Sequence, residues 1–315
     1  MKLVGSRLHF IISILYGFLW FGCQGGAFNI GDVGTSENPL QKSGELTENE
    51  VWAGRIQILG DVIVPEGKTL TIRSDSVVGF DPITGVHQLI VRGSLYAEGE
   101  PDRQIIFGSL GTETEMPKTE DWVGIRFEET SLNSRLSYCR IQHADTALSS
   151  QSNGLQIESS LLNNNRLAIL CDDASPLISD NEINKNGTAI RCLKSASPEI
   201  TRNSIQANEF GVVCDDDSRP MIQYNEIASN YQHAVVSYAS ASPEIVSNNI
   251  VLNGGWAVYD GGRLRENYIR GNKEIGPDVV ERGTGRESGQ FYGVDEVLDP
   301  RAAPVPDAGT QREGY

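Results

Sequence analysis

Positive charge is scarce in this sequence, and this scarcity restricts the partners that the chain can bind. The 315 residues include 26 Lys and Arg against 42 Asp and Glu, so the formal net charge is −16. Nucleic acid and anionic lipid surfaces are bound through clustered basic residues, which argues against both. An acidic polysaccharide is repelled as well, unless a divalent cation bridges it to the chain. Four His and three Met leave little material for a soft-metal site.

Long apolar runs are also missing, with one exception at the N-terminus. Residues 8–21 form an apolar stretch of 14 residues that follows Lys2 and Arg7. This stretch is short for a membrane span but has the length of the apolar core of a secretion signal. The sequence therefore predicts a signal peptide over residues 1–22 and export of the chain to the periplasm or the cell surface.

Gly22 and Cys23 follow the apolar stretch and resemble a bacterial lipobox. The resemblance implies that Cys23 is acylated and becomes the first residue of a membrane-anchored protein. An ordinary cleaved signal or an uncleaved anchor is the alternative. Residues 23–48 contain few apolar residues, so we expect a flexible tether after the anchor.

Helical periodicity is absent as well, and a short repeat stands in its place. An Asn recurs at 181, 203, 225, 248 and 267, with Ser160 and Cys139 at the equivalent earlier positions. The repeat of about 22 residues contains three short β-branched segments separated by polar turns. Three strands and three turns per repeat predict one coil of a parallel β-helix. The Asn tolerates left-handed backbone, so we place it at a tight turn between two strands.

Two columns of apolar residues are predicted to stack inside the solenoid. They are Ile183, Ile205, Ile227, Ile250 and Ile269, and Ile169, Ile190, Val212, Val235 and Val258. Alternation along the strand also directs Cys171, Cys192 and Cys214 inward, in neighbouring coils. These thiols form a buried apolar stack, a disulfide, or a metal or redox site; Cys139 is the fourth cysteine of the domain.

The opening coils carry a family resemblance. The segments Gly60–Ile72, Leu89–Gly99 and Trp122–Phe127 resemble the first coils of right-handed parallel β-helix proteins of the pectate-lyase-like superfamily. We therefore expect an all-β, single-stranded solenoid of about ten coils over residues 49–272, followed by a capping segment and loose tail over 273–315. The superfamily includes lyases, hydrolases, epimerases, adhesins and non-catalytic proteins, so the resemblance leaves function open.

The resemblance to pectate lyases implies an active site on the outer face of one sheet. There Arg191 would act as a base beside Asp172 and Asp215. Oxygen ligands for Ca²⁺, the one cofactor considered, would come from Asp172, Asp173, Asp215 and Asp216. Alternatively, paired carboxylates would hydrolyse glycosides. Against catalysis, Asp172 and Asp215 lie two coils, or about 10 Å, apart with Leu193 between them, and acidic turn residues are commonly only solvated.

Aromatic residues gather near the same face in later coils. We predict ligand contacts from Tyr238, Trp256 and Tyr259, with Lys194 beside them, because exposed rings stack on sugars. Packing at a solenoid edge is the alternative for these rings, as for Phe210 and Tyr231. His143 and His233 lie some four coils apart, so they cannot share a metal, and we expect both to be solvent-exposed.

These observations predict a monomeric, non-catalytic, membrane-tethered β-helix that binds a polysaccharide or an envelope protein along its long face. A polysaccharide lyase or glycoside hydrolase is the first alternative. A structural envelope protein is the second.

Overall fold

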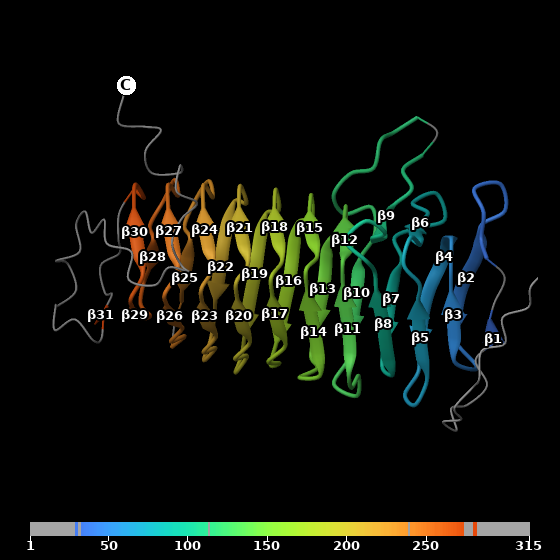
Figure 1. The fold of residues 1–315 in the computed structure, drawn as a ribbon, viewed down its shortest axis with the longest axis horizontal. Coiled ribbons are helices and arrows are strands. Elements are labelled where there is room, and N and C mark those ends of the chain that lie inside the picture. The colour runs from blue at the N-terminus through green and yellow to red at the C-terminus, as the bar shows by residue number, and fades with distance from the viewer. Residues whose placement is uncertain (1–28, 31–32, 113, 239, 274–279, 282–315) are drawn as a thin grey trace, which may run out of the picture.

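The backbone winds into a solenoid of parallel strands stacked along one long axis (Figure 1). The computed structural model describes residues 29–30, 33–112, 114–238, 240–273 and 280–281. Within these residues all regular structure is β, in about ten right-handed turns. The predicted all-β, right-handed parallel β-helix is therefore confirmed. In these residues no helix is long and apolar enough to cross a membrane.

Each complete coil contributes one strand to each of three sheets. Sheet 1 comprises β1 (Asn29–Ile30), β3 (Glu50–Trp52), β5 (Thr69–Ile72), β8 (Ser94–Glu98), β11 (Ser134–Ser137), β14 (Leu155–Glu158), β17 (Leu177–Ser179), β20 (Glu199–Thr201), β23 (Met221–Gln223), β26 (Glu244–Val246), β29 (Arg263–Arg265) and β31 (Val280–Glu281). Sheet 2 comprises β6 (Val77–Phe80), β9 (Ile105–Ser109), β12 (Cys139–Gln142), β15 (Leu161–Asn163), β18 (Glu182–Asn184), β21 (Ser204–Gln206), β24 (Glu226–Ala228), β27 (Asn249–Val251) and β30 (Tyr268–Arg270). Sheet 3 comprises β7 (Gln88–Val91), β10 (Gly124–Phe127), β13 (Thr146–Ser150), β16 (Leu167–Asp172), β19 (Thr188–Leu193), β22 (Phe210–Cys214), β25 (Val235–Ser237) and β28 (Val258–Tyr259).

Sheets 2 and 3 join at the N-terminal end, where two strands run through the corner between them. These strands are β2 (Leu40–Glu45) and β4 (Arg55–Val64). The first half of β4 pairs with β6 and its second half with β7, while β2 pairs with β4 along its length. The solenoid therefore begins before residue 49, and the segment from residue 40 differs from the predicted tether. Leu40 is the only strongly apolar residue of β2, so its composition hides the strand.

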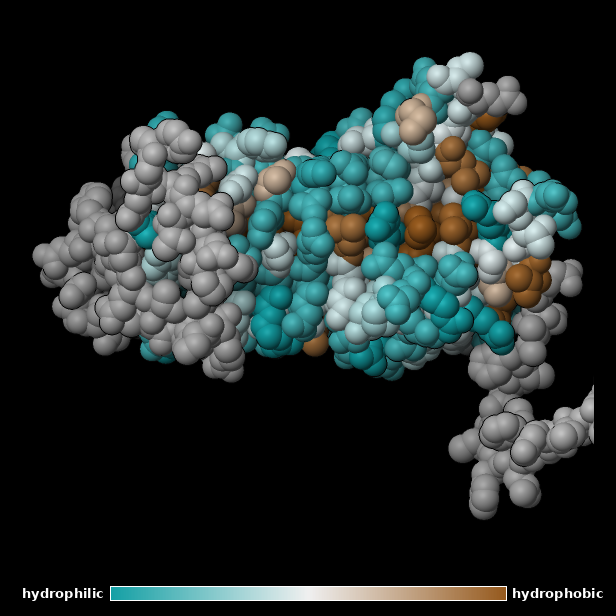
Figure 2. Space-filling view, turned by 45° about the horizontal axis from the view of Figure 1, so that its top comes forward, coloured by the Kyte–Doolittle hydropathy of each residue, from teal (hydrophilic) through white to brown (hydrophobic). Residues whose placement is uncertain are grey.

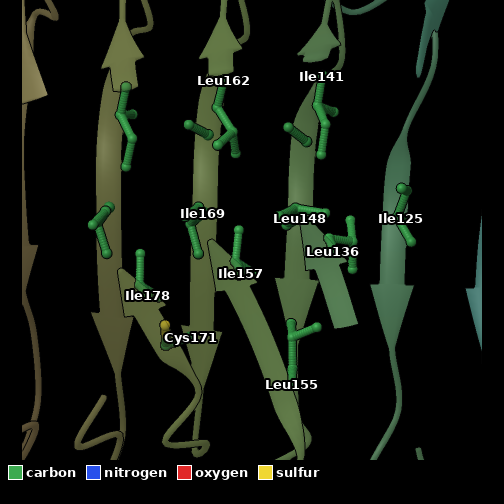
Figure 3. Close-up of a cluster of buried hydrophobic side chains, with 14 of the residues drawn as sticks. Ile125, Leu136, Ile141, Leu148, Leu155, Ile157, Leu162, Ile169, Cys171 and Ile178 are labelled. Carbon is green, nitrogen blue, oxygen red and sulfur yellow. The ribbon is translucent and has the colours of Figure 1, made fainter. Parts of the chain in front are cut away.

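The two predicted apolar columns form the interior. In-register pairing joins Ile183 to Ile205 and Ile205 to Ile227 in sheet 2, and the column continues through Ile250 to Ile269. The column from Ile169 to Val258 in sheet 3 pairs in the same way. Figure 3 shows side chains of the three sheets directed into one interior. Burial of each such side chain contributes about 1.5–3 kcal/mol.

Stacked asparagine amides close the corner between sheets 1 and 2. Asn203 donates from its backbone N–H to Asn225 Oδ1 (2.8 Å), and its Nδ2 donates to Ile178 O of the preceding coil (2.9 Å). The ladder runs through Asn181, Asn225, Asn248 and Asn267, with Ser160 and Cys139 ahead of it as predicted. The left-handed residue is the one before each Asn, such as Asp180 or Arg202, and not the Asn itself. The Asn stays free to point inward because its neighbour makes the turn.

A second asparagine ladder, which was not predicted from the sequence, closes the corner between sheets 2 and 3. It consists of Asn165, Asn186, Asn208, Asn230, Asn253 and Asn272. Ala144 donates its backbone N–H to Asn165 at the N-terminal end of the ladder. A left-handed residue such as Lys185 or Ala207 again precedes the Asn. Two corners of each regular coil therefore share one construction.

The ladders predict a large stability loss for Asn203→Ala. The change removes the acceptor of the buried Asn181 backbone N–H and a donor to Ile178 O, and an unsatisfied buried group costs about 1–3 kcal/mol. We expect a loss of about 3 kcal/mol, measured as a lower urea midpoint by circular dichroism. The control is Asn184→Ala, which removes an amide that donates to Glu182 at the surface and should cost about 0.5 kcal/mol or less. Equal losses in the two variants would contradict the role of the ladder.

Candidate functional site

The outer face of sheet 3 has the register that the repeat predicts. Pairing aligns Leu170 with Arg191, Arg191 with Val213, and Val236 with Tyr259. In the next outward column Asp172 lies opposite Leu193. Figure 2 shows a different long face of the molecule, for which the top of Figure 1 comes forward, and on it hydrophobic patches lie between hydrophilic margins.

Four charged residues of this face form two ion pairs between successive coils. Arg191 Nε donates to Asp215 Oδ2 (2.8 Å), and Lys194 Nζ lies 2.7 Å from Asp172 Oδ1. The cations are about half exposed, whereas the Asp215 and Asp172 side chains are 17% and 19% exposed. The hydrogen bond to Asp172 raises the pKa of Lys194. We call Asp172, Arg191, Lys194 and Asp215 the charged group; each carboxylate in it is neutralised by a cation.

The polar track continues toward the N-terminus. Gln151 Nε2 donates to the second oxygen of Asp172 (3.0 Å). Glu128, in the corresponding place directly after β10, accepts from Arg92 Nε (2.8 Å) and Arg126 Nη2 (2.7 Å). These bonds lower the pKa of Glu128, and Arg92 makes the largest contribution. Neither the group of Arg92, Arg126 and Glu128 nor the bond of Gln151 was predicted, because these residues precede the regular repeats.

The predicted catalytic residues are brought together in pairs, but not as one constellation. Arg191 contacts Asp215, whereas Asp172 contacts Lys194, and Leu193 lies in the coil between the two carboxylates. A guanidinium bound to a carboxylate is held as a cation and is a poor proton acceptor. Catalysis by Arg191, Asp172 and Asp215 stays a prediction.

The carboxylates predicted to bind Ca²⁺ are used in other contacts. Asp172 and Asp215 bind cations, and Asp216 Oδ2 accepts the backbone N–H of Lys194 (3.0 Å). Asp173 and Asp216 adopt left-handed backbone at the turn after the strand. Across the described ranges no group of three or more His, Cys, Asp or Glu could hold a metal. The residues do not fit a calcium ion as arranged, and no step proposed below depends on one.

The predicted aromatic residues meet in one cluster over the last coils. The Tyr259 ring lies 6.0 Å from Trp256 and 6.4 Å from Tyr238, between ring centroids, with edge-to-face geometry in both cases. His233 stacks on Tyr259 at 5.0 Å with an interplanar angle of 14°, and Phe210 lies 6.0 Å from His233. We call these five residues the aromatic cluster. Tyr238 is 42% exposed, and the other four are partly exposed, so their rings are accessible to a ligand.

His233 differs from the solvent-exposed residue that we expected, because it is part of this cluster. Its Nδ1 accepts the backbone N–H of Trp256 (2.9 Å), which fixes the ring as the neutral tautomer that carries its proton on Nε2. Burial, with a smaller effect of Lys273, lowers the pKa of His233. Phe210, His233 and Trp256 each precede a Gly or Ala at the start of the sheet 3 segment. The recurrence of a ring at this position in successive coils could have predicted that His233 belongs to the aromatic cluster.

The other predicted site residues lie apart from the aromatic cluster. Lys194 belongs to the charged group, and Tyr231 is 71% exposed in the turn before sheet 3. His143 is half-buried rather than exposed, and burial lowers its pKa. Cys23 and the signal peptide over residues 1–22 lie outside the described residues.

The four cysteines of the described part are buried and free. Cys171, Cys192 and Cys214 occupy successive rungs of sheet 3, as the repeat predicts. The hydrogen bond to Cys192 and burial raise the pKa of Cys171 and of Cys214. Burial also raises the pKa of Cys139, which lies apart in sheet 2. The arrangement agrees with the apolar stack and lies inside the solenoid, away from the candidate face.

Comparison with protein families decides the membership of the chain. Residues 123–288 match the model described as the right handed beta helix region. The chain belongs to this right-handed β-helix family. The family match extends over the charged group and the aromatic cluster, and it names no ligand for either.

Comparisons with individual proteins give less information than the family match. No curated protein sequence matches this chain. Among solved structures, the periplasmic alginate epimerase AlgG is 15% identical with a TM-score of 0.47, over 79% of this chain and 70% of that one. The Dettilon tailspike protein is also 15% identical, with a TM-score of 0.40 over 76% of this chain and 56% of that one. Neither similarity bears on the function of this chain.

The geometry of His233 predicts a pH-dependent stability. Because its pKa is lowered in the folded chain, the unfolded chain binds the proton more readily below the ordinary pKa of about 6.5. The stability is therefore full above that pH and falls as the pH drops through it. In His233→Asn, Oδ1 can replace Nδ1 as the acceptor without titrating, so we expect a smaller loss of melting temperature between neutral and mildly acidic pH. Identical pH profiles for the two proteins would contradict this.

Proposed function

We propose that this protein binds glycan, without chemical turnover, along the outer face of sheet 3. The observation that carries the proposal is the aromatic cluster, in which five partly exposed rings from three successive coils are in contact. A ring held by its neighbours on a rigid sheet presents a flat apolar surface at little further entropic cost. Sugar rings offer a matching flat array of C–H groups, and aromatic side chains suit such contacts.

The charged group supplies the polar half of the same surface. Tyr238 lies beside Asp215 on the next coil, because the Tyr238 backbone N–H donates to Cys214 O (2.8 Å). A ligand that extends along the solenoid axis would therefore leave the rings and meet the Arg191–Asp215 pair. An ion pair presents both donors and acceptors to hydroxyl groups, which also have both. The two groups thus form one face suited to an extended polyol.

The paired state of the carboxylates favours binding over catalysis. A general acid or base must contact the reacting atoms directly, whereas Asp172 and Asp215 are each engaged by a cation of the neighbouring coil. The lyase or hydrolase function therefore stays an alternative outcome of the experiment below. A purely structural role in the envelope would not account for the accessible rings of the aromatic cluster.

Replacing Trp256 with Ala tests the proposal. We expect Trp256→Ala and Tyr238→Ala each to weaken binding to the best ligand of a glycan array about tenfold, as for loss of a central aromatic contact. The matched control is Tyr231→Ala, which removes an exposed ring outside the cluster and should leave the affinity unchanged. Dissociation constants come from isothermal titration calorimetry.

Two outcomes would contradict the proposal. One is equal affinity in the Trp256→Ala and wild-type proteins. The other is cleavage of a polysaccharide by the wild-type protein that disappears in Asp215→Ala with the fold intact, because this result would favour an enzyme.

We further propose that the chain is exported and anchored through Cys23. The basic start, the apolar stretch of residues 8–21 and the Gly22–Cys23 pair support this from sequence. We expect Cys23→Ser to move the protein from the membrane pellet to the soluble fraction, because one acylated residue would provide the attachment. Unchanged sedimentation of Cys23→Ser, in cells where a known lipoprotein responds to the same change, would argue for a different anchor.

A further inference from the structure

The charge around the aromatic cluster is not balanced. Five carboxylates flank it in sequence: Glu209 before Phe210, Asp215, Asp216 and Asp217 in the turn below Tyr238, and Asp260 after Tyr259. Ser240 Oγ contacts Asp217 Oδ1 (2.5 Å) and ties this acidic turn to the coil of Tyr238. Three cations lie beside the cluster: Arg191 in its pair with Asp215, the exposed Arg219 two residues after Asp217, and Lys273, whose backbone N–H donates to Gly255 O (2.9 Å). Five carboxylates against three cations leave an excess of two negative charges.

Several of these carboxylates are available to a ligand. Asp260 is exposed at the left-handed turn after Tyr259, and Glu209 is exposed in the turn before Phe210. Asp217 has one neutral hydroxyl partner in Ser240. The faces of the Trp and Tyr rings add to this field, because the negative face of an aromatic ring attracts cations. The surface therefore favours a ligand with positive charge.

We infer that the glycan bound by the aromatic cluster carries free amino groups, as a polymer of hexosamine units does. The inference rests on the proposed function and specifies its ligand. The sugar ring would lie against the aromatic cluster, and its ammonium group would lie within reach of Asp260, Asp217 or Glu209. A protonated amine satisfies both surfaces, whereas a hydroxyl or an acetamido group satisfies only the polar contacts.

Polyuronates carry negative charge where a hexosamine polymer carries positive charge. Each unit carries a carboxylate, which the excess negative charge of the cluster and the net charge of −16 both repel. Bridging by Ca²⁺ would require converging oxygen ligands, and the part of the chain seen in the structure contains no such group of His, Cys, Asp or Glu. The face is therefore expected to reject an acidic polysaccharide.

The test compares three ligands of equal length with the full-length protein. The ligands are a glucosamine hexamer, its fully N-acetylated counterpart and a galacturonate hexamer. At a mildly acidic pH we expect calorimetry to give about fivefold tighter binding of the glucosamine hexamer than of the N-acetylated one, with a preference that shrinks as salt is added. Equal or tighter binding of the N-acetylated or the galacturonate hexamer would overturn this inference and leave the proposed function standing. Absence of binding to all three and to every glycan of the array would overturn both.

Charge variants separate specific recognition from general attraction to an acidic protein. Glu209→Gln with Asp260→Asn should remove most of the preference for the free amine and keep the affinity for the N-acetylated hexamer. The matched control Glu66→Gln removes an exposed charge in the opening coils and should change neither. Trp256→Ala keeps every charge and should bind the glucosamine hexamer about tenfold more weakly. If Trp256→Ala still bound that hexamer with wild-type affinity, the interaction would be non-specific and the inference would be wrong.

Discussion

In-register stacking of similar side chains is the constraint on which this molecule depends. Each regular coil is too thin to bury its own apolar residues, so it is stable only when the coils on either side cover it. The asparagine ladders enforce that match, because Asn203 bonds to Ile178 of one neighbouring coil and to Asn225 of the other. A shift of one residue would break these bonds and turn inward side chains outward. The outer face inherits its order from this interior register.

The repeat made the interior predictable. The column through Ile183 and Ile205 and the rungs of Cys171 and Cys192 follow from a spacing of about 22 residues and from strand alternation. The same register correctly placed Arg191, Asp215 and Tyr259 on one outer face. The second asparagine ladder had the same spacing, but its sequence surroundings vary from coil to coil. Periodicity therefore predicts a column of stacked residues well when the residues next to it in the sequence also repeat from coil to coil.

What the sequence did not predict depends on contacts between columns. His233 was expected to be exposed, but its ring stacks on Tyr259 and accepts a bond from Trp256 across a turn whose path no repeat specifies. The pairing of Lys194 with Asp172, instead of a carboxylate cluster for Ca²⁺, depends on side-chain reach. The strand β2 was hidden by its polar composition. Such features require three-dimensional coordinates because long side chains can choose among several partners.

The layered construction determines how the length of the outer face along the solenoid axis can change. Each ladder asparagine bonds only within its own coil and to the coils directly above and below it, so duplication of one whole turn would insert without a mismatch at either junction. The rings around Tyr259 and the ions around Arg191 would then stand one layer, about 4.8 Å, further apart, each otherwise unaltered. Lineages of this architecture can thus lengthen or shorten the footprint on a polymer in fixed steps while the chemistry at each end is conserved.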